Sequence, residues 1–301
     1  MTMKSFSPKD LSLSEFHSYL LGAVTPRPVA FASSVDNQGN VNLSPFSFFN
    51  AFSANPPILV FSPSRRGKDN TTKHTYENIR EVPEVVINIA NYNLVEQMSL
   101  ASSNYAKGVN EFVKAGLTEV KSAMVKPPRV LEAPIAFECN VNEVIQLGDK
   151  GGAGNLVICE ILLMHITEEI LDENEKINPV KLDAVGRLGE DWYCRVIPDS
   201  IFRVPKPTQH LGIGFDSLPD EIKKSPVLSG NNLARLAGVK ELPNKEFLEQ
   251  IKNSVEVSDV FTRFINDKES MEYHLHMLGK AALERGETDL AWAYLLASKS
   301  N

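Results

Sequence analysis

Short apolar runs separated by polar turns dominate the first two thirds of the chain. Residues 29–35, 58–61 and 85–90 are short runs of the kind that form buried strands. Residues 135–147 alternate apolar and polar positions, and 156–166 form the matching return segment after a glycine-rich turn. Many short strands with few helices predict a closed or nearly closed antiparallel barrel, and the long return strand is expected to bend.

Three short helices are expected between these strands. Ser12 or Ser14 can cap a helix that places Phe16, Tyr19 and Leu20 on one face. Further helices are expected over 72–80 and 94–102, whereas 103–134 is rich in loops. The alternation of strands with long helices that makes a parallel dinucleotide-binding sheet is missing, and so is a Gly-x-Gly-x-x-Gly motif.

The pattern changes near residue 200, where prolines mark a boundary. We expect a barrel domain over 1–200 and a helical extension over 201–301. The helical segments of the extension are 233–236, 245–252, 257–265, 271–285 and 288–299. Gly286 should end one helix of the last pair, and the extension is interpreted as a packing or dimerisation element.

Composition narrows the class of protein. The 301 residues carry a net charge of −7, which argues against a general nucleic-acid surface. The chain has 3 cysteines, too few and too scattered for a disulfide framework, and their usage fits a reducing cytoplasm. We expect neither a signal peptide nor a membrane-spanning segment, since no apolar run approaches about 18 residues.

The loop over 62–75 stands out against this acidic background. It combines serine and threonine hydroxyls with four cations and one acid, and a helix is expected to follow it. Hydroxyls such as Ser62 can replace the water around a phosphate, while arginine offers paired hydrogen bonds and lysine a point charge. A helix start adds backbone N–H groups. The pattern favours a phosphate site, with a solvated basic loop as the alternative.

An aromatic segment over 44–57 precedes that loop. Four phenylalanines lie within seven residues, interleaved with serine and asparagine. Such a stripe can simply be core, but its polar groups and backbone amides also suit the edge of a flavin ring. The histidines show no metal-ligand spacing, and we find no acid–base pair and no nucleophile motif. No catalytic residue and no metal site are therefore predicted.

Six fragments together carry a family resemblance. Residues 25–34 (Thr-Pro-Arg-Pro-Val-Ala-Phe-Ala-Ser-Ser), 42–57 and 73–79 resemble the flavin-reductase-like, FMN-binding split-barrel family. Glu-Phe at 111–112, the expected strand around Glu138-Cys139 and Arg-Leu-Gly-x-x-Trp-Tyr at 187–193 resemble later positions of that family. The similarity covers about residues 15–197. His74 stands where the family usually has aspartate, which leaves no carboxylate role at that position.

The resemblance implies a mainly β fold, a split barrel followed by the helical extension, in a homodimer that holds FMN at its interface. The implied phosphate contacts are Ser64, Arg65, Lys73 and Thr75, with Ser62 as a further hydroxyl. The implied ring contacts are Ser47, Phe48, Phe49 and Asn50, with Arg27 and Pro28 nearby.

The activity expected on this basis is FMN reduction by NADH or NADPH, with a small-molecule redox substrate as the further partner. The protein's task is then to orient the cofactor, and no acid–base residue is required. Two alternatives remain open: a flavin-binding electron carrier without nicotinamide activity, and an interaction protein that uses the C-terminal helices. The choice between NADH and NADPH, the final electron acceptor, the retention of FMN and the role of 205–301 are not fixed by the sequence.

Overall fold

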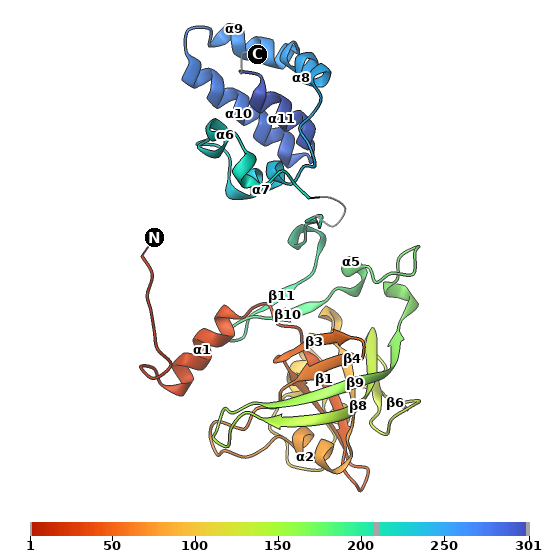
Figure 1. Ribbon diagram of the computed structural model, residues 1–301. Coiled ribbons are helices and arrows are strands. Elements are labelled where there is room, and N and C mark those ends of the chain that lie inside the picture. The colour runs from red at the N-terminus through yellow and green to blue at the C-terminus, as the bar shows by residue number, and fades with distance from the viewer. Residues whose placement is uncertain (1, 207–210, 299–301) are drawn as a thin grey trace. The chain divides into compact units, whose positions relative to one another are not determined.

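The computed structural model describes residues 2–206 and 211–298. It divides into two compact units, Met1–Phe202 and Arg203–Asn301. The first unit contains all the strands of the described chain, and the second is helical (Figure 1). Each unit has a hydrophobic core of its own.

A seven-stranded antiparallel sheet forms the first unit. Its order is β2-β1-β5-β8-β9-β4-β3. The strands are β1 (Ala30–Val35), β2 (Val41–Phe46), β3 (Phe49–Ala54), β4 (Pro57–Phe61), β5 (Glu84–Ile89), β8 (Ile135–Gln146) and β9 (Asn155–Ile166). The two edge strands, β2 and β3, follow each other in the chain, so the sheet curls into a barrel that stays open between them. The expected split barrel is confirmed.

The two longest strands bend as expected. β8 and β9 are 12 residues each and curve across the barrel in Figure 1. Their register shifts between Glu138 and Cys139 and again between Val141 and Glu143. A β-bulge of this kind bends the strand and increases its twist, so one long hairpin can follow the curvature of the barrel.

Strand β1 is buried on both faces because it separates two cores. Ala30 and Ala32 face the barrel interior together with Phe61. Phe31 faces the opposite way, toward Met98 in a second cluster. That second cluster lies under α3 (Val95–Ala101) and α4 (Glu111–Ala115). All six residues of β1 are buried, including the polar Ser33 and Ser34, as this double burial requires.

The expected first helix is confirmed, but its apolar face is not covered. Ser12 caps α1 (Leu13–Ala23) in a capping box with Glu15, which satisfies two backbone groups at once. No residue of α1 is buried, and Tyr19 is 56% exposed. The expected second helix is α2 (His74–Glu81), whose N-cap is Lys73.

The aromatic segment 44–57 is mostly strand. β2 runs to Phe46, and β3 begins three residues later as an edge strand paired only with β4. The smaller elements of the unit are η1 (Tyr92–Leu94), β6 (Glu119–Val120), β7 (Arg129–Val130), η2 (Glu168–Ile170), α5 (Pro179–Leu182), β10 (Val185–Arg187), β11 (Tyr193–Arg195) and η3 (Pro198–Ser200).

The second unit is a small helical domain. Its elements are η4 (Phe215–Ser217), α6 (Asp220–Lys223), α7 (Gly230–Ala237), α8 (Lys245–Lys252), α9 (Val255–Arg263), α10 (Lys268–Glu284) and α11 (Thr288–Leu296). The expected final pair of helices is confirmed as α10 and α11, and the last residues of that prediction, 299–301, lie outside the described chain. Trp292 is fully buried between them and α7, where its indole N–H donates to the carbonyl of Leu236 at 3.2 Å.

Candidate functional site

A groove of about 1010 Å³ lies beside the loop that follows β4. Four separate parts of the barrel unit form it: the start of α1, the cationic loop with the start of α2, residues 104–107, and Gly152 in the turn between β8 and β9. Its lining includes Leu13, Ser14, His17, Ser64, Arg65, Arg66, Lys68, Asp69, Thr71, Lys73, His74, Tyr105, Lys107 and Gly152. The cationic loop therefore faces a cavity large enough for a cofactor.

Backbone hydrogen bonds tie this loop to the turn between β8 and β9. The N–H of Arg65 donates to the carbonyl of Ala153 at 2.8 Å, and the N–H of Gly152 donates back to Arg65 at 3.0 Å. Gly152 has φ +86°, and a Cβ there would lie 3.3 Å from the side chain of Leu13. Glycine is therefore needed where the turn, the loop and α1 meet.

The approach is equally close at Gly151. A Cβ at this position would lie 3.1 Å from the carbonyl oxygens of both Arg66 and Gly67. Glycine thus allows the backbones of the turn and the loop to lie against each other.

The two arginines brace the loop from within. Arg65 donates from Nε to the side-chain oxygen of Asn70 at 2.7 Å and from Nη2 to the Asn70 carbonyl at 2.6 Å. Arg66 donates to the hydroxyl of Thr71 at 3.0 Å and to the carbonyl of Thr72. These contacts hold both guanidinium groups in place. An anion that binds in the groove would therefore cost little further side-chain entropy at the two arginines.

Lys73 is a half-buried cation of the groove. Its side chain is half-buried at the N-cap of α2, and it has no carboxylate partner among the described residues. Desolvation lowers the pKa of Lys73, and the nearby charge of Arg66 lowers it further. A partly desolvated ammonium beside a second cation is unfavourable alone and is relieved by an anion.

The hydroxyls of Thr75 and Ser62 point into the protein instead of the groove. Thr75 is 1% exposed and donates to the side-chain oxygen of Asn42 at 2.7 Å. The Asn42 amide donates to Glu111 at 2.8 Å, and burial raises the pKa of Glu111. Ser62 accepts a hydrogen bond from the backbone N–H of Asn155 at 3.0 Å. Both residues therefore hold the loop and α2 in position.

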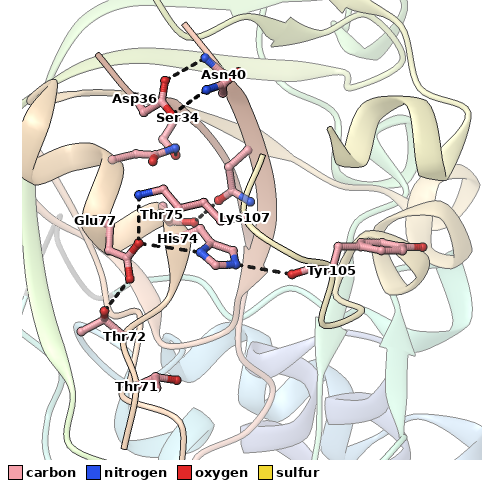
Figure 2. Close-up of polar contacts among 12 residues, drawn as sticks. Ser34, Asp36, Asn40, Thr71, Thr72, His74, Thr75, Glu77, Tyr105 and Lys107 are labelled. Atoms are coloured by element: carbon pink, nitrogen blue, oxygen red, sulfur yellow. Dashed lines mark hydrogen bonds and ion pairs between the residues drawn. The ribbon is translucent and has the colours of Figure 1, made fainter. Parts of the chain in front are cut away.

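Glu77 links the cationic loop to the wall of the groove that residues 104–107 form (Figure 2). It accepts a hydrogen bond from the Thr72 hydroxyl at 2.8 Å and pairs with the Lys107 ammonium at 3.3 Å. His74 lies between the two walls, with Nδ1 3.8 Å from Glu77 and Nε2 3.4 Å from the carbonyl of Tyr105. His74, at the position where the resemblance implies an aspartate, thus bridges α2 and residues 104–107.

The segment Ser47–Asn50, which the resemblance implies as the contact for the flavin ring and which is called the ring segment below, lies next to the groove. The carbonyl of Phe48 accepts a hydrogen bond from the Ser62 N–H at 2.9 Å, which joins the segment to the start of the loop. The Phe48 ring lies 6.4 Å from that of His17, a groove residue. Phe49 pairs with Phe61 in the sheet, and Asn50 is exposed.

Arg27 is a structural clamp more than a free cation. It is 5% exposed, and its Nη1 donates to the carbonyls of Leu21 and Val24, both at 2.5 Å, which caps the end of α1. Burial lowers the pKa of Arg27, with a smaller effect from Arg187. Its Nε donates to the hydroxyl of Ser47 at 3.4 Å, which links Arg27 to the segment Ser47–Asn50. Pro28 is exposed beside it.

The structure thus brings together Ser64, Arg65 and Lys73 in the groove. It leaves Thr75 and Ser62 outside the lining. Sequence reasoning missed the wall residues His17, Tyr105 and Lys107. The sequence has no local signal for these three, because they come from segments far from the cationic loop.

Two features are absent from the described residues. No group of three or more histidine, cysteine, aspartate or glutamate side chains in 2–206 and 211–298 could hold a metal ion. Across the same ranges, the helices are too short or too polar to cross a lipid bilayer.

The family model described as flavin reductase like domain matches residues 21–181. An uncharacterised protein of Aquifex aeolicus is 35% identical over 199 residues, which is 66% of this chain and 99% of the relative. An uncharacterised protein of Halalkalibacterium halodurans is 34% identical over 204 residues, covering 67% and 96%.

Solved structures agree with this match. Nitrilotriacetate monooxygenase component B from Bacillus cereus is 29% identical with a TM-score of 0.63, covering 68% of this chain and 100% of that one. The 2-nitrobenzoate 2-nitroreductase NbaA from Pseudomonas fluorescens is 28% identical with a TM-score of 0.59, covering 68% and 98%. The chain therefore belongs to the flavin reductase like family.

Proposed function

We propose that this protein is an FMN-dependent oxidoreductase that reduces FMN with NADH or NADPH. The observation that carries the proposal is the half-buried ammonium of Lys73, which has no carboxylate partner in the described chain and lies in a groove with Arg65 and Arg66. Such a site stabilises a dianionic phosphate, because each charge-assisted hydrogen bond contributes roughly 1.5–3 kcal/mol.

The donor set fits FMN in both of its parts. The phosphate would take Ser64, Arg65 and Lys73, with the backbone N–H groups at the start of α2. The ring would lie against Ser47–Asn50, whose backbone is joined to the loop through Phe48 and Ser62. Thr75 and Ser62 would support the site from behind. When bound, FMN would supply the hydride-transfer chemistry.

The residues of this chain then have positioning roles. Arg27 holds the end of α1 and Ser47 together, and its positive charge near the ring segment favours a reduced, anionic flavin. His74 and Glu77 keep the two walls of the groove at a fixed separation. No proton donor or acceptor is required from the protein for hydride transfer.

We also propose a homodimer, because two surfaces of the barrel unit lack a covering partner in the described chain. β3 is an edge strand with every residue after Phe49 exposed, and Phe52 is 68% exposed. α1 has no buried residue. Exposed edges and apolar helix faces are usually covered in native proteins, and a second copy of this chain would cover both.

A cytoplasmic location belongs to the same proposal. Its support is that the three cysteines are free in the structure, and that burial, with a smaller effect of Glu138, raises the pKa of Cys139 to about 12. Inert buried thiols of this kind suit a reducing compartment.

The test is an anaerobic titration. The purified protein is first titrated with FMN by fluorescence quenching, and NADH or NADPH is then added while the visible flavin spectrum is recorded. We expect saturable FMN binding and bleaching of the flavin band. A yellow protein that neither nucleotide bleaches would refute the hydride step and favour an electron carrier. Absence of FMN binding at millimolar concentration would refute the whole proposal and favour an interaction protein.

A further inference from the structure

A second cavity of about 360 Å³ lies between α3 and the β10–β11 hairpin. Its lining shares no residue with the phosphate groove. The lining residues are Tyr92, Val95, Glu96, Ser99, Val185, Arg187, Asp191, Tyr193, Cys194 and Arg195. The volume lies at the small end of the roughly 300–1,000 Å³ range of small-molecule sites, so it suits a ligand fragment about the size of one nucleotide.

Two stacked pairs give the cavity flat, rigid walls. The Arg195 guanidinium lies 3.6 Å from the ring centroid of Tyr92, and Asp183 fixes it with hydrogen bonds of 2.7 and 2.8 Å. Arg187 lies 4.7 Å from the ring centroid of Tyr193 and donates to its hydroxyl at 2.7 Å. Preformed planar surfaces of this kind bind a planar aromatic ring by stacking with little loss of side-chain entropy.

The polar groups of the cavity favour a heteroaromatic ring over a simple anion. Two carboxylates, those of Glu96 and Asp191, offset the two guanidinium groups in the lining. Glu96 and the Ser99 hydroxyl line the cavity from α3, and they can accept hydrogen bonds from an exocyclic amine. Arg187 also donates from Nη2 to the carbonyl of Glu190 at 2.6 Å and lies 3.7 Å from the Asp191 carboxylate. The Nε of Arg187 and the Nη1 of Arg195 make none of these contacts, and their N–H groups are suited to one phosphate.

The cavity adjoins the proposed ring site through the backbone of Arg27. The N–H of Arg27 donates to the carbonyl of Arg187 at 2.9 Å, and the N–H of Arg187 donates back at 2.8 Å. Arg27 in turn reaches Ser47 with its side chain, whereas Arg187 lines the cavity. A single pair of residues therefore separates the cavity from the segment that would hold the flavin ring.

We propose that this cavity binds the adenine nucleotide half of the reduced nicotinamide co-substrate. Adenine stacks on the Tyr92–Arg195 wall with its amino group toward Glu96, and the adjoining phosphate lies near Arg187. The proposal rests on the proposed function, because it assigns a second binding site for the same co-substrate.

Reduced nicotinamide mononucleotide tests this assignment, because it carries the same reacting ring without the adenine half. In wild-type protein we expect its KM to exceed that of the better of NADH and NADPH by about tenfold or more. Tyr92→Ala should raise the KM for that dinucleotide by about tenfold, leave its kcat within a small factor and leave the KM for the mononucleotide unchanged. Tyr92→Phe, which keeps the ring, should restore the wild-type KM.

The matched control is Tyr273→Ala, since Tyr273 has similar exposure, 43% against 47%, but belongs to the helical unit. It should change neither KM. If Tyr92→Ala shifts the two KM values equally or not at all while wild-type protein reduces FMN, the adenine assignment is wrong and the proposed function stands. If wild-type protein with bound FMN shows no reduction by any of the nucleotides, the proposed function fails first.

Binding of AMP gives a readout that does not depend on activity. Calorimetric titration of the FMN-loaded protein should show AMP binding in the millimolar range or tighter, weakened by Tyr92→Ala and not by Tyr273→Ala. AMP that binds equally to wild type and Tyr92→Ala, or that does not bind at all, would overturn the assignment.

Discussion

The two units of this chain differ most in what they bury. All but one of the buried polar or charged side chains in the described residues belong to the barrel unit, among them Arg27, Glu111 and Glu138. The helical unit contributes only His276 to that set and otherwise packs an apolar core around Trp292. Helices satisfy their own backbone hydrogen bonds, whereas a barrel with long loops needs buried side chains to hold those loops.

The comparison indicates where function is located. In the barrel unit, buried polar groups fix the loop, α1 and α2 around the groove, so their removal should affect cofactor binding. The family match also ends at residue 181, inside that unit. In the helical unit, the same kind of core substitution should affect only the stability of the unit itself. The four predictions below test this separation, from the largest expected effect to the smallest.

Trp292→Ala should destabilise the helical unit by about 3–5 kcal/mol, because it leaves a cavity where the indole is fully enclosed. Urea unfolding followed by far-ultraviolet circular dichroism should show an early transition that accounts for the helical signal. FMN affinity should stay at the wild-type value. A parallel loss of FMN binding would show that the units are not separate.

Lys73→Ala should weaken FMN binding by about 10- to 100-fold, since it removes the half-buried cation of the groove. The measurement is an FMN titration by fluorescence. The control is Lys280→Ala, a half-buried lysine of the helical unit, which should leave the affinity unchanged. If both variants bind FMN as wild type does, the phosphate does not bind at Lys73.

Glu138→Gln should cost the barrel unit about 1–3 kcal/mol near neutral pH. The buried carboxylate accepts hydrogen bonds from the N–H groups of Ala123 and Met124 and from His165, and an amide cannot accept all three. Burial opposes ionisation, but these hydrogen bonds outweigh it and lower the pKa of Glu138.

The pH dependence of that variant has a definite sign. Because the native pKa of Glu138 is lowered, the stability it contributes is present above the unfolded value of about 4.3 and is lost as the pH falls through the native value. Urea unfolding of residues 1–202 between about pH 7 and pH 3 should show wild type losing more stability than Glu138→Gln. Parallel curves for the two proteins would contradict this.

Deletion of 203–301 should have the smallest effect on the proposed activity. The truncated chain keeps the complete sheet and groove, so we expect wild-type FMN affinity and a single cooperative unfolding transition. A truncated chain that folds but loses FMN would assign the helical unit a direct role in the cofactor site.

Features that depend on neighbouring residues were predictable from the sequence. The sequence offers Ser12 or Ser14 as the cap of α1, and the structure uses Ser12. The glycine-rich stretch 148–154 predicts the turn between β8 and β9. Gly286 likewise separates α10 from α11. In each case the signal and the structure lie within a few residues of each other, so tertiary contacts did not alter the outcome.

Side-chain direction was not predictable, because partners far along the chain decide it. Thr75 turns inward because Asn42, 33 residues earlier, accepts its hydroxyl hydrogen, and Asn42 is oriented in turn by Glu111. The same limit applies to the aromatic segment: Phe46 packs on Phe61 in the core, whereas Phe52 is exposed on an edge strand. A composition that suits a ligand contact also suits an edge strand.

The close approach at Gly151 makes the hairpin turn part of the proposed cofactor site. Lengthening that turn, or giving residue 151 a side chain, would displace the main chain at Arg66 and Gly67 although no charged group had been altered. If the loop binds the phosphate as proposed, its affinity depends on the length of a surface connection, and engineering there would change cofactor affinity without altering a cation.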